Sequence, residues 1–199
     1  MSADIEFVPT PMAPRVSRRL PGVEGVWVFV FADMAVFALM FGCFMWDRHL
    51  QPESFEVSRR ALDLTMGGVN TLILLTSSML VVLAIDALKY AENALAPVFL
   101  GLATLCGLAF IVNKAFEYRE KFEAGIGLQT NDFFMYYFIM TGMHLGHVVV
   151  GTVILAALAL KARSSRAGGS IVAYEGGATY WHMVDLLWVC LFPLLYLVR

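Results

Sequence analysis

Two histidines stand in a part of the sequence that offers little access to water. The stretch TGMHLGHVVVG, residues 141–151, places His144 and His147 three residues apart. No Asp, Glu, Lys or Arg occurs from Phe133 to Leu160. Imidazoles in such a setting can ligate a metal or haem, carry protons, or form hydrogen bonds between helices. Which of these uses applies depends on the helices that position the two histidines.

Three further ionisable residues, Asp33, His182 and Asp185, interrupt apolar stretches elsewhere in the chain. An ionisable group inside a membrane is costly, so function or pairing is the default hypothesis. A helix rises about 1.5 Å per residue, which puts these three residues in one half of the bundle, with His147 just above them. Asp33, His147, His182 and Asp185 are therefore the candidates for a proton-related role.

The spacing of the histidines argues against a bound metal or haem. One helix cannot place His144 and His147 on both faces of a haem, and His147 and His182 are predicted at different depths, roughly 20 and 6 Å from the same end. No Cys or His cluster has zinc spacing, and no histidines on separate helices line up for copper. The sequence therefore predicts no metal site, no redox cofactor and no catalytic residue.

Helix packing is the favoured interpretation of the two central histidines, and proton handling is the alternative. Gly142, Gly146 and Gly151 lie around them, and small residues let helix backbones approach closely. Interhelical hydrogen bonds from His144 and His147 are expected to contribute about 1 kcal/mol each.

Other polar and aromatic residues are also predicted to pack or to lie at the membrane surface. Lys114 and Glu117, spaced i, i+3, are predicted to form a solvated ion pair at the interface. Trp181 is expected in an aromatic belt, and the deeper Trp188 is expected to pack or to contact lipid or a partner. The belt also includes Trp27 and Trp46. A polar stripe predicted to face a neighbouring helix comprises Asn70, Thr71, Thr76, Ser77 and Ser78.

The composition and the charge pattern place these residues in a membrane protein. The chain has 199 residues, of which 59% are hydrophobic and 15% charged. A soluble domain carries about a quarter charged residues. Five apolar runs of 21 to 28 residues separate the charges, and about 20 residues cross the hydrocarbon as a helix. The fold class is therefore an all-α, polytopic, five-helix transmembrane bundle.

The bundle is predicted to follow an extended N-terminal arm, residues 1–21, which is rich in proline and arginine. Residues 22–199 form the membrane domain, without repeats or an extramembrane domain. Its helices are predicted at about 26–46, 65–85, 94–113, 133–160 and 178–198.

Several function classes and covalent features are excluded by the same pattern. No basic stripe suggests nucleic acid, and no cleavable signal peptide is expected. Cys43, Cys106 and Cys190 fall within predicted spans and are expected to be small buried residues. Basic residues divide evenly between the two sides, but the clusters at 15–19 and 161–166 share one side. That side, with the N-terminus, is predicted to be cytoplasmic.

Several strings resemble subunit III of haem–copper oxidases. TGMHLGHVVVG and YWHMVDLLWVCLFPLLY, residues 180–196, are similar to its signature segments. Further support comes from FVFADMAVFALMFGCF (29–44), NTLILLTSSMLVVLA (70–84) and KAFEYREKFEAGI (114–126). The resemblance implies a subunit of the bacterial cytoplasmic membrane without haem or copper, packed beside a catalytic haem-bearing subunit. It also implies bound phospholipid and support for sustained turnover and proton uptake.

One departure from this family lies at Asp33. The family usually has a membrane-embedded glutamate where FADMAVF places this shorter carboxylate. The strings FADM, KAFEYREKFEAGI and TNDFFMYYF look closer to NorE-type members associated with nitric oxide reductase. The favoured function is thus a NorE-like accessory subunit, and the alternative is subunit III of a terminal cytochrome c or quinol oxidase. A small proton or solute transporter and a stand-alone haem or metal enzyme are alternatives of other classes.

Overall fold

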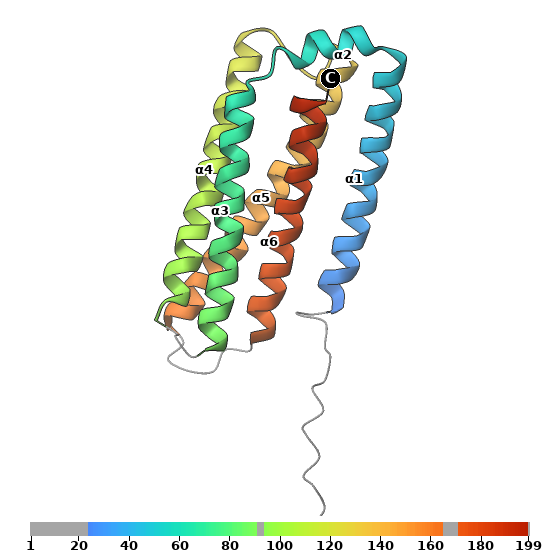
Figure 1. The fold of residues 1–199 in the computed structure, drawn as a ribbon. Helices are drawn as coiled ribbons and strands as arrows, with labels where there is room; N and C mark the ends of the chain where they lie inside the picture. The colour runs from blue at the N-terminus through green and yellow to red at the C-terminus, as the bar shows by residue number, and fades with distance from the viewer. Residues whose placement is uncertain (1–23, 91–93, 165–170, 199) are drawn as a thin grey trace, which may run out of the picture.

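The chain folds into long helices that run side by side (Figure 1). The structure is a computed structural model that describes residues 24–90, 94–164 and 171–198, so the predicted arm at 1–21 lies outside it. The elements are α1 (Glu24–Leu50), α2 (Pro52–Arg59), α3 (Leu64–Lys89), α4 (Ala96–Glu123), α5 (Asp132–Ser164), α6 (Ile171–Phe192) and the π-helical segment η1 (Pro193–Leu197).

Five of these helices are long and apolar enough to cross a membrane, which confirms the predicted fold class. The helices extend beyond the apolar runs: α4 continues past residue 113 to Glu123, and α6 begins at Ile171 rather than 178. An apolar run measures the hydrocarbon thickness, whereas a helix continues into polar residues that favour it. The Arg119–Glu123 pair, 2.7 Å apart and spaced i, i+4, supports the end of α4.

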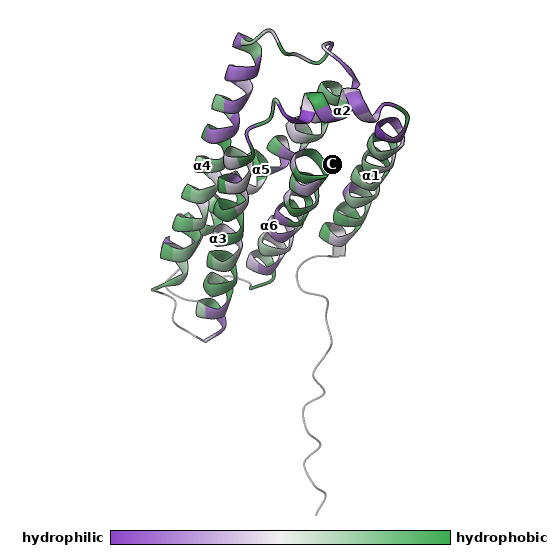
Figure 2. Cartoon of the chain, turned by 45° about the horizontal axis from the view of Figure 1, so that its top comes forward, coloured by the Kyte–Doolittle hydropathy of each residue, from purple (hydrophilic) through white to green (hydrophobic). Residues whose placement is uncertain are grey.

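The helices α3, α4, α5 and α6 form the main bundle, with the closest packing between α3 and α4 (Figure 1). Helix α1 stands to one side, where it contacts α5 and α6 less extensively. The short helix α2, which the sequence analysis missed, lies across one end beside η1, and we call this the α2 end. Hydrophilic residues gather at this end, including on the C-terminal turns of α4, whereas the middles of the helices are mostly hydrophobic (Figure 2).

Local chemistry fixes two helix ends at the α2 end. Asp63 is the N-cap of α3, where its carboxylate accepts hydrogen bonds from the backbone N–H groups of Thr65 (2.8 Å) and Met66 (3.2 Å). Pro193 has no backbone N–H, so the regular hydrogen-bond ladder of α6 is broken there. The chain continues as η1, in which the N–H of Val198 donates to the carbonyl of Pro193 at 2.9 Å.

Trp181 is fully buried at the centre of the bundle, so the prediction that it lies in an aromatic belt is wrong. Trp181 lies ten residues after the start of α6 at Ile171, on the buried face of the helix that also includes Tyr174, Val184 and Trp188. Gly107 of α4 and Gly151 of α5 leave the space that its ring fills. A Cβ atom at Gly151 would lie 2.7 Å from Cε3 of Trp181.

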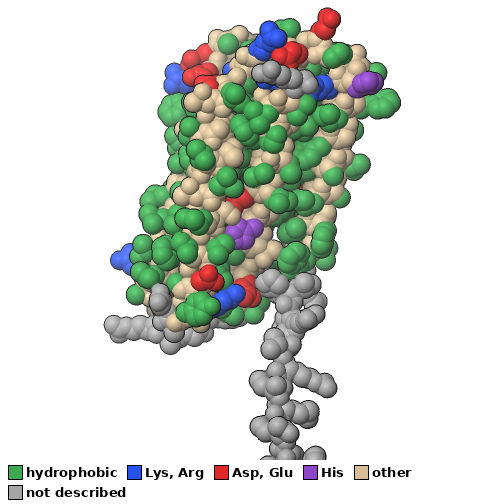
Figure 3. All heavy atoms as spheres, in the orientation of Figure 1, with side chains coloured by type: hydrophobic (Ala, Val, Ile, Leu, Met, Phe, Trp, Pro, Cys, Tyr) green, Lys and Arg blue, Asp and Glu red, His purple; other side chains and the backbone are tan. Residues whose placement is uncertain are grey.

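The outer surface has the distribution of hydrophobic and charged side chains that is typical of a protein in contact with lipid. Hydrophobic side chains cover the middle of the visible face and charged ones gather at its two ends (Figure 3). Trp46 is 66% exposed, as expected of a belt residue. Cys43 and Cys190 are free and exposed, so the prediction that they are buried is wrong. These positions face outward because lipid accepts a small apolar side chain as readily as the core does.

We expect Gly151→Ala to lower the free energy of unfolding by about 1–3 kcal/mol, because the rigid indole of Trp181 must shift. Gly42→Ala is the matched control, since nothing lies within 4 Å of a Cβ atom at that position. Thermal unfolding of both variants in the same detergent measures the difference. Equal melting temperatures would contradict this packing.

Candidate functional site

Lys114 and Glu117 form the most enclosed polar group of the protein. Their side chains are 0% and 1% exposed, and Nζ of Lys114 lies 3.0 Å from Oε2 of Glu117. Tyr137 of α5 donates its hydroxyl hydrogen to Oε1 of Glu117 at 2.7 Å, and Tyr196 of η1 donates to the same oxygen at 2.5 Å. Nζ of Lys114 also donates to both hydroxyls, at 3.3 and 3.2 Å. We call these four residues the Lys114 cluster.

Aromatic rings enclose the ammonium group of Lys114. Its Nζ lies 5.0 Å from the ring centres of Tyr137 and Trp188, 5.6 Å from that of Tyr118, and 5.7 Å from that of Tyr196. An ammonium over a ring face is stabilised by the electrostatic field of the ring. The charge is thus compensated by a carboxylate, two hydroxyl groups and several ring faces.

The prediction that Lys114 and Glu117 form a solvated pair is wrong. Because α4 continues to Glu123, these residues do not lie at the end of the helix. They belong to the face of α4 that is buried from its beginning, through Ala103, Gly107 and Phe110. The spacing of that face in the sequence, three or four residues at each step, could have revealed the burial. Nothing local could have identified Tyr137 and Tyr196 as the partners.

His144 is fully buried, but its two ring nitrogens have no hydrogen-bond partner among the described residues. Its ring stacks on Trp188 with centres 5.2 Å apart and meets Phe110 edge-on at 5.6 Å. The predicted interhelical hydrogen bond is therefore wrong for His144. Packing holds the imidazole in place instead, and Trp188 donates its own N–H to Thr71 Oγ1 of α3 at 3.0 Å.

His147 points toward α1 and pairs with Asp33. Its Nε2 lies 3.2 Å from Oδ1 of Asp33, and its Nδ1 lies 2.9 Å from the carbonyl oxygen of Met143. A carbonyl only accepts, so Nδ1 carries a hydrogen. The contact between Nε2 and Oδ1 is then favourable only when one further proton lies on either partner.

An open apolar groove runs beside this pair. It has a volume of about 740 Å³ and lies between α1, α5 and α6. His147 lines it together with Phe29, Gly146 and Tyr180. Oδ2 of Asp33 is buried and has no partner among the described residues. A carboxyl group and an imidazole thus meet at the edge of a surface that lipid or another protein can reach.

His182 and Asp185 form a separate polar group between α3 and α6. Nδ1 of His182 lies 2.7 Å from Oγ of Ser78 and 3.9 Å from Oδ2 of Asp185. The side chain of His182 is 37% exposed, whereas that of Asp185 is 7% exposed. In the described part of the chain, no hydrogen bond or ion pair joins this group to Asp33. The structure thus divides the four candidate residues into two pairs, each with one histidine and one carboxylate.

The polar stripe of α3 contacts neighbouring helices, as its pattern predicts. Oδ1 of Asn70 accepts a hydrogen bond from Nδ2 of Asn113 at 3.1 Å, and Ser77 donates to the carbonyl of Ala103 at 3.1 Å. Thr76 differs, since its hydroxyl is exposed and donates to a carbonyl of its own helix. The stripe therefore helps to join α3 to α4 and α6.

The three polar groups differ in the chemistry that they can perform. The Lys114 cluster has no opening in the described structure, so it serves to hold α4, α5 and η1 together. The Asp33–His147 pair borders an open groove, so lipid or a neighbouring protein can approach it. His182 also lines a groove, of about 240 Å³, with Lys89 and Glu175 at its edge. In the described ranges, no three His, Cys, Asp or Glu side chains converge as metal ligands do.

Known proteins resemble this chain over nearly its whole length. A family model of cytochrome c oxidase subunit III matches residues 20–198. Cytochrome c oxidase subunit 3 of Synechocystis sp. is 29% identical over all of this chain and 85% of the relative. The same subunit of Thermostichus vulcanus is 31% identical over 88% of this chain and 87% of the relative. A heme-copper oxidase subunit I+III of Aeropyrum pernix is 31% identical over 88% of this chain, which spans 22% of that longer protein.

We expect Lys114→Met to lower the free energy of unfolding by about 3–5 kcal/mol, because the carboxylate of Glu117 is left buried without its counter-charge. The double variant Lys114→Met/Glu117→Gln removes both charges and should be more stable than the single one. Arg119→Met breaks an exposed pair of the same helix and should cost less than about 1 kcal/mol. Unfolding in detergent compares the three, and equal losses for both single variants would contradict the role of burial.

Proposed function

Because this chain belongs to the cytochrome c oxidase subunit III family, we propose that it is a non-catalytic membrane subunit packed beside the catalytic haem-bearing subunit of a respiratory oxidase. The match over residues 20–198 carries this proposal. The relative from Aeropyrum pernix, whose name joins subunits I and III, supports a direct partnership between the two. Its place would be the bacterial cytoplasmic membrane, with the N-terminus in the cytoplasm.

The subunit would support its partner in two ways. The groove of about 740 Å³ offers an apolar surface for phospholipid chains, lined by Val26, Phe29 and Val150. The Asp33–His147 pair at its edge would hold a proton and so assist proton uptake by the catalytic subunit. The groove and the Asp33–His147 pair both lie between α1 and the main bundle, where the helices pack least closely.

We infer that the proposed partner reduces oxygen. The support is that the similar relatives are named as oxidase subunits. Such a complex would be a terminal cytochrome c or quinol oxidase. Association with nitric oxide reductase, which the NorE-like strings indicate, stays a prediction. A transporter is disfavoured because α1, α3, α4 and α5 cross the membrane without the mid-membrane breaks that form transporter sites.

We expect the tagged protein, purified in mild detergent, to bring down a larger haem-bearing subunit. An optical spectrum of the preparation and mass identification of the partners measure this. Oxidase subunits would support the proposal, and nitric oxide reductase subunits would move the assignment to the NorE-type members. A solitary, colourless protein would contradict a stable partnership.

We expect Asp33→Asn to lower the sustained turnover of the complex several-fold while assembly remains normal. The amide keeps the size of the carboxylate but cannot take a proton from His147. Asp33→Glu is the control and should retain turnover, because it restores a carboxyl group. Oxygen consumption over many turnovers, compared with the yield of intact complex, separates the two roles. Equal turnover of the Asn variant and the wild type would reduce Asp33 to a packing residue.

A further inference from the structure

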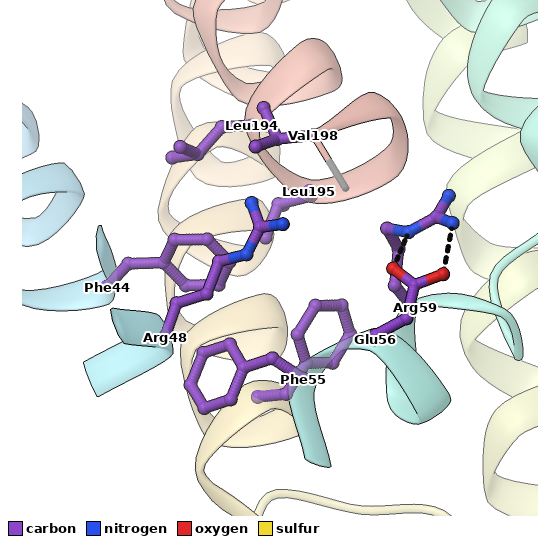
Figure 4. Close-up of a pocket in the computed structure, with 9 residues that line it drawn as sticks. Phe44, Arg48, Phe55, Glu56, Arg59, Leu194, Leu195 and Val198 are labelled. Atoms are coloured by element: carbon purple, nitrogen blue, oxygen red, sulfur yellow. Dashed lines mark hydrogen bonds and ion pairs between the residues drawn. The ribbon is translucent and has the colours of Figure 1, made fainter. Parts of the chain in front are cut away.

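An unpaired arginine lies at the α2 end of the bundle. Arg48 belongs to the last turn of α1 and is half-buried. Among the residues that the structure describes, none accepts a hydrogen bond from its guanidinium and no acid pairs with it. Figure 4 shows the guanidinium beside Leu195, whereas the nearby Glu56 is bound to Arg59. Arginine stays charged in proteins, so this group needs an acceptor.

Glu56 is not available to Arg48, because two other arginines already hold it. Arg59 donates to both of its carboxylate oxygens, at 2.9 and 2.8 Å, and Arg60 donates at 3.1 Å. These hydrogen bonds, those from Arg59 first, lower the pKa of Glu56 to about 2. Arg59 also donates to the carbonyl oxygen of Tyr196 at 2.9 Å, which fixes its position against η1. The Glu56–Arg59 pair is thus complete without Arg48.

The space behind Arg48 cannot supply the missing acceptor. The cavity there measures about 10 Å³ and is lined by Phe44, Phe55, Phe133 and Leu195 (Figure 4). That volume holds about one water molecule, and the one acid that lines it, Glu56, is already held by Arg59 and Arg60. An acceptor for Arg48 must therefore approach from the open side.

A groove of about 690 Å³ opens on that side. Arg48, His49 and Glu53 line it, with Met45 and Val198 as apolar neighbours. Glu53 is exposed and has no hydrogen-bond or ion-pair partner among the described residues. Because Arg48 lies in the last turn of a membrane-crossing helix, the groove is at the level of the lipid headgroups. It thus presents, at the membrane surface, one cation and one anion that no described residue pairs.

We propose that this groove binds the headgroup of a zwitterionic aminophospholipid, with its phosphate on Arg48 and its ammonium on Glu53. A guanidinium donates two parallel hydrogen bonds to a phosphate, and His49 adds a donor beside it. An anionic lipid would satisfy Arg48 but leave Glu53 facing negative charge without a counter-ion. Met45 and Val198 give the start of the acyl chains an apolar contact. The site lies apart from the groove beside Asp33 and does not depend on which complex the subunit serves.

The test uses the full-length protein in detergent, exchanged into phosphatidylethanolamine or phosphatidylglycerol and examined by native mass spectrometry. The wild type should retain phosphatidylethanolamine in preference to phosphatidylglycerol. Arg48→Gln should raise its dissociation constant about tenfold or more, and Arg48→Lys by less, because lysine cannot form the paired hydrogen bonds. Glu53→Gln should abolish the preference for phosphatidylethanolamine. Arg60→Ala, at an arginine that is 72% exposed on the same end, should change neither value.

Three results would overturn the proposal. The first is unchanged lipid retention in both Arg48 variants, with the fold intact by thermal unfolding. The second is binding of inorganic phosphate that depends on Arg48 and displaces the lipid, which would make the groove a site for free anions. The third is a carboxylate of the catalytic subunit on Arg48 in the purified complex, detected by cross-linking. A failed pull-down of the partner would affect only the proposed function.

Discussion

The buried ion pair between Lys114 and Glu117 is the interaction on which the arrangement of this bundle depends. Two charges leave water completely, and such a pair is stable only when its remaining donors and acceptors are satisfied. Tyr137 and Tyr196 supply them from α5 and from η1. The cluster therefore selects one relative placement of three elements, since any other leaves a charge unpaired. This is a specificity that apolar packing between membrane helices cannot provide by itself.

The two ends of the bundle are built differently as a consequence. At the α2 end, the Lys114 cluster lies close to a second set of contacts, in which Arg59 joins Glu56 of α2 to the backbone of η1. The break in the hydrogen-bond ladder of α6 at Pro193 matters here, because the π-helical turn that follows places Tyr196 in both groups of contacts. Its hydroxyl donates to Glu117 in the Lys114 cluster, and its carbonyl accepts from Arg59. Toward the opposite end α1 is held mainly by its contacts with α5 and α6, including the Asp33–His147 pair. A firmly joined end and a loosely joined helix give the protein a rigid frame, with one groove beside α1 and another between α3 and α6.

That division suits the proposed function, in which the protein acts through its surfaces. The enclosed charges hold the frame, whereas the carboxylate–imidazole pairs lie where lipid, water or a neighbouring subunit can reach them. Arg48 and Glu53, which have no partner among the described residues, likewise line an open groove at the α2 end. Several buried polar atoms have no hydrogen-bond partner among the described residues, including Oδ2 of Asp33, both carboxylate oxygens of Asp185 and Nε1 of Trp181. His144 is the extreme case, because both of its ring nitrogens lack a partner and its ring is held by packing against Trp188 and Phe110.

The sequence by itself determined the five membrane-crossing helices, because the spacing of charges reports directly on the thickness of the hydrocarbon. It also determined the contact face of α3 and, through the similarity of its strings, the family. It could not determine which residues meet. Trp181 and Lys114 were expected at the surface because an apolar run gives no sign of where a helix ends, and both lie inside. The pairing of His147 with Asp33 rather than with His182 or Asp185 depends on how α1 and α5 are rotated and placed against each other. Only the tertiary structure decides that, because each helix satisfies its own backbone and leaves its neighbours to be chosen by side-chain contacts.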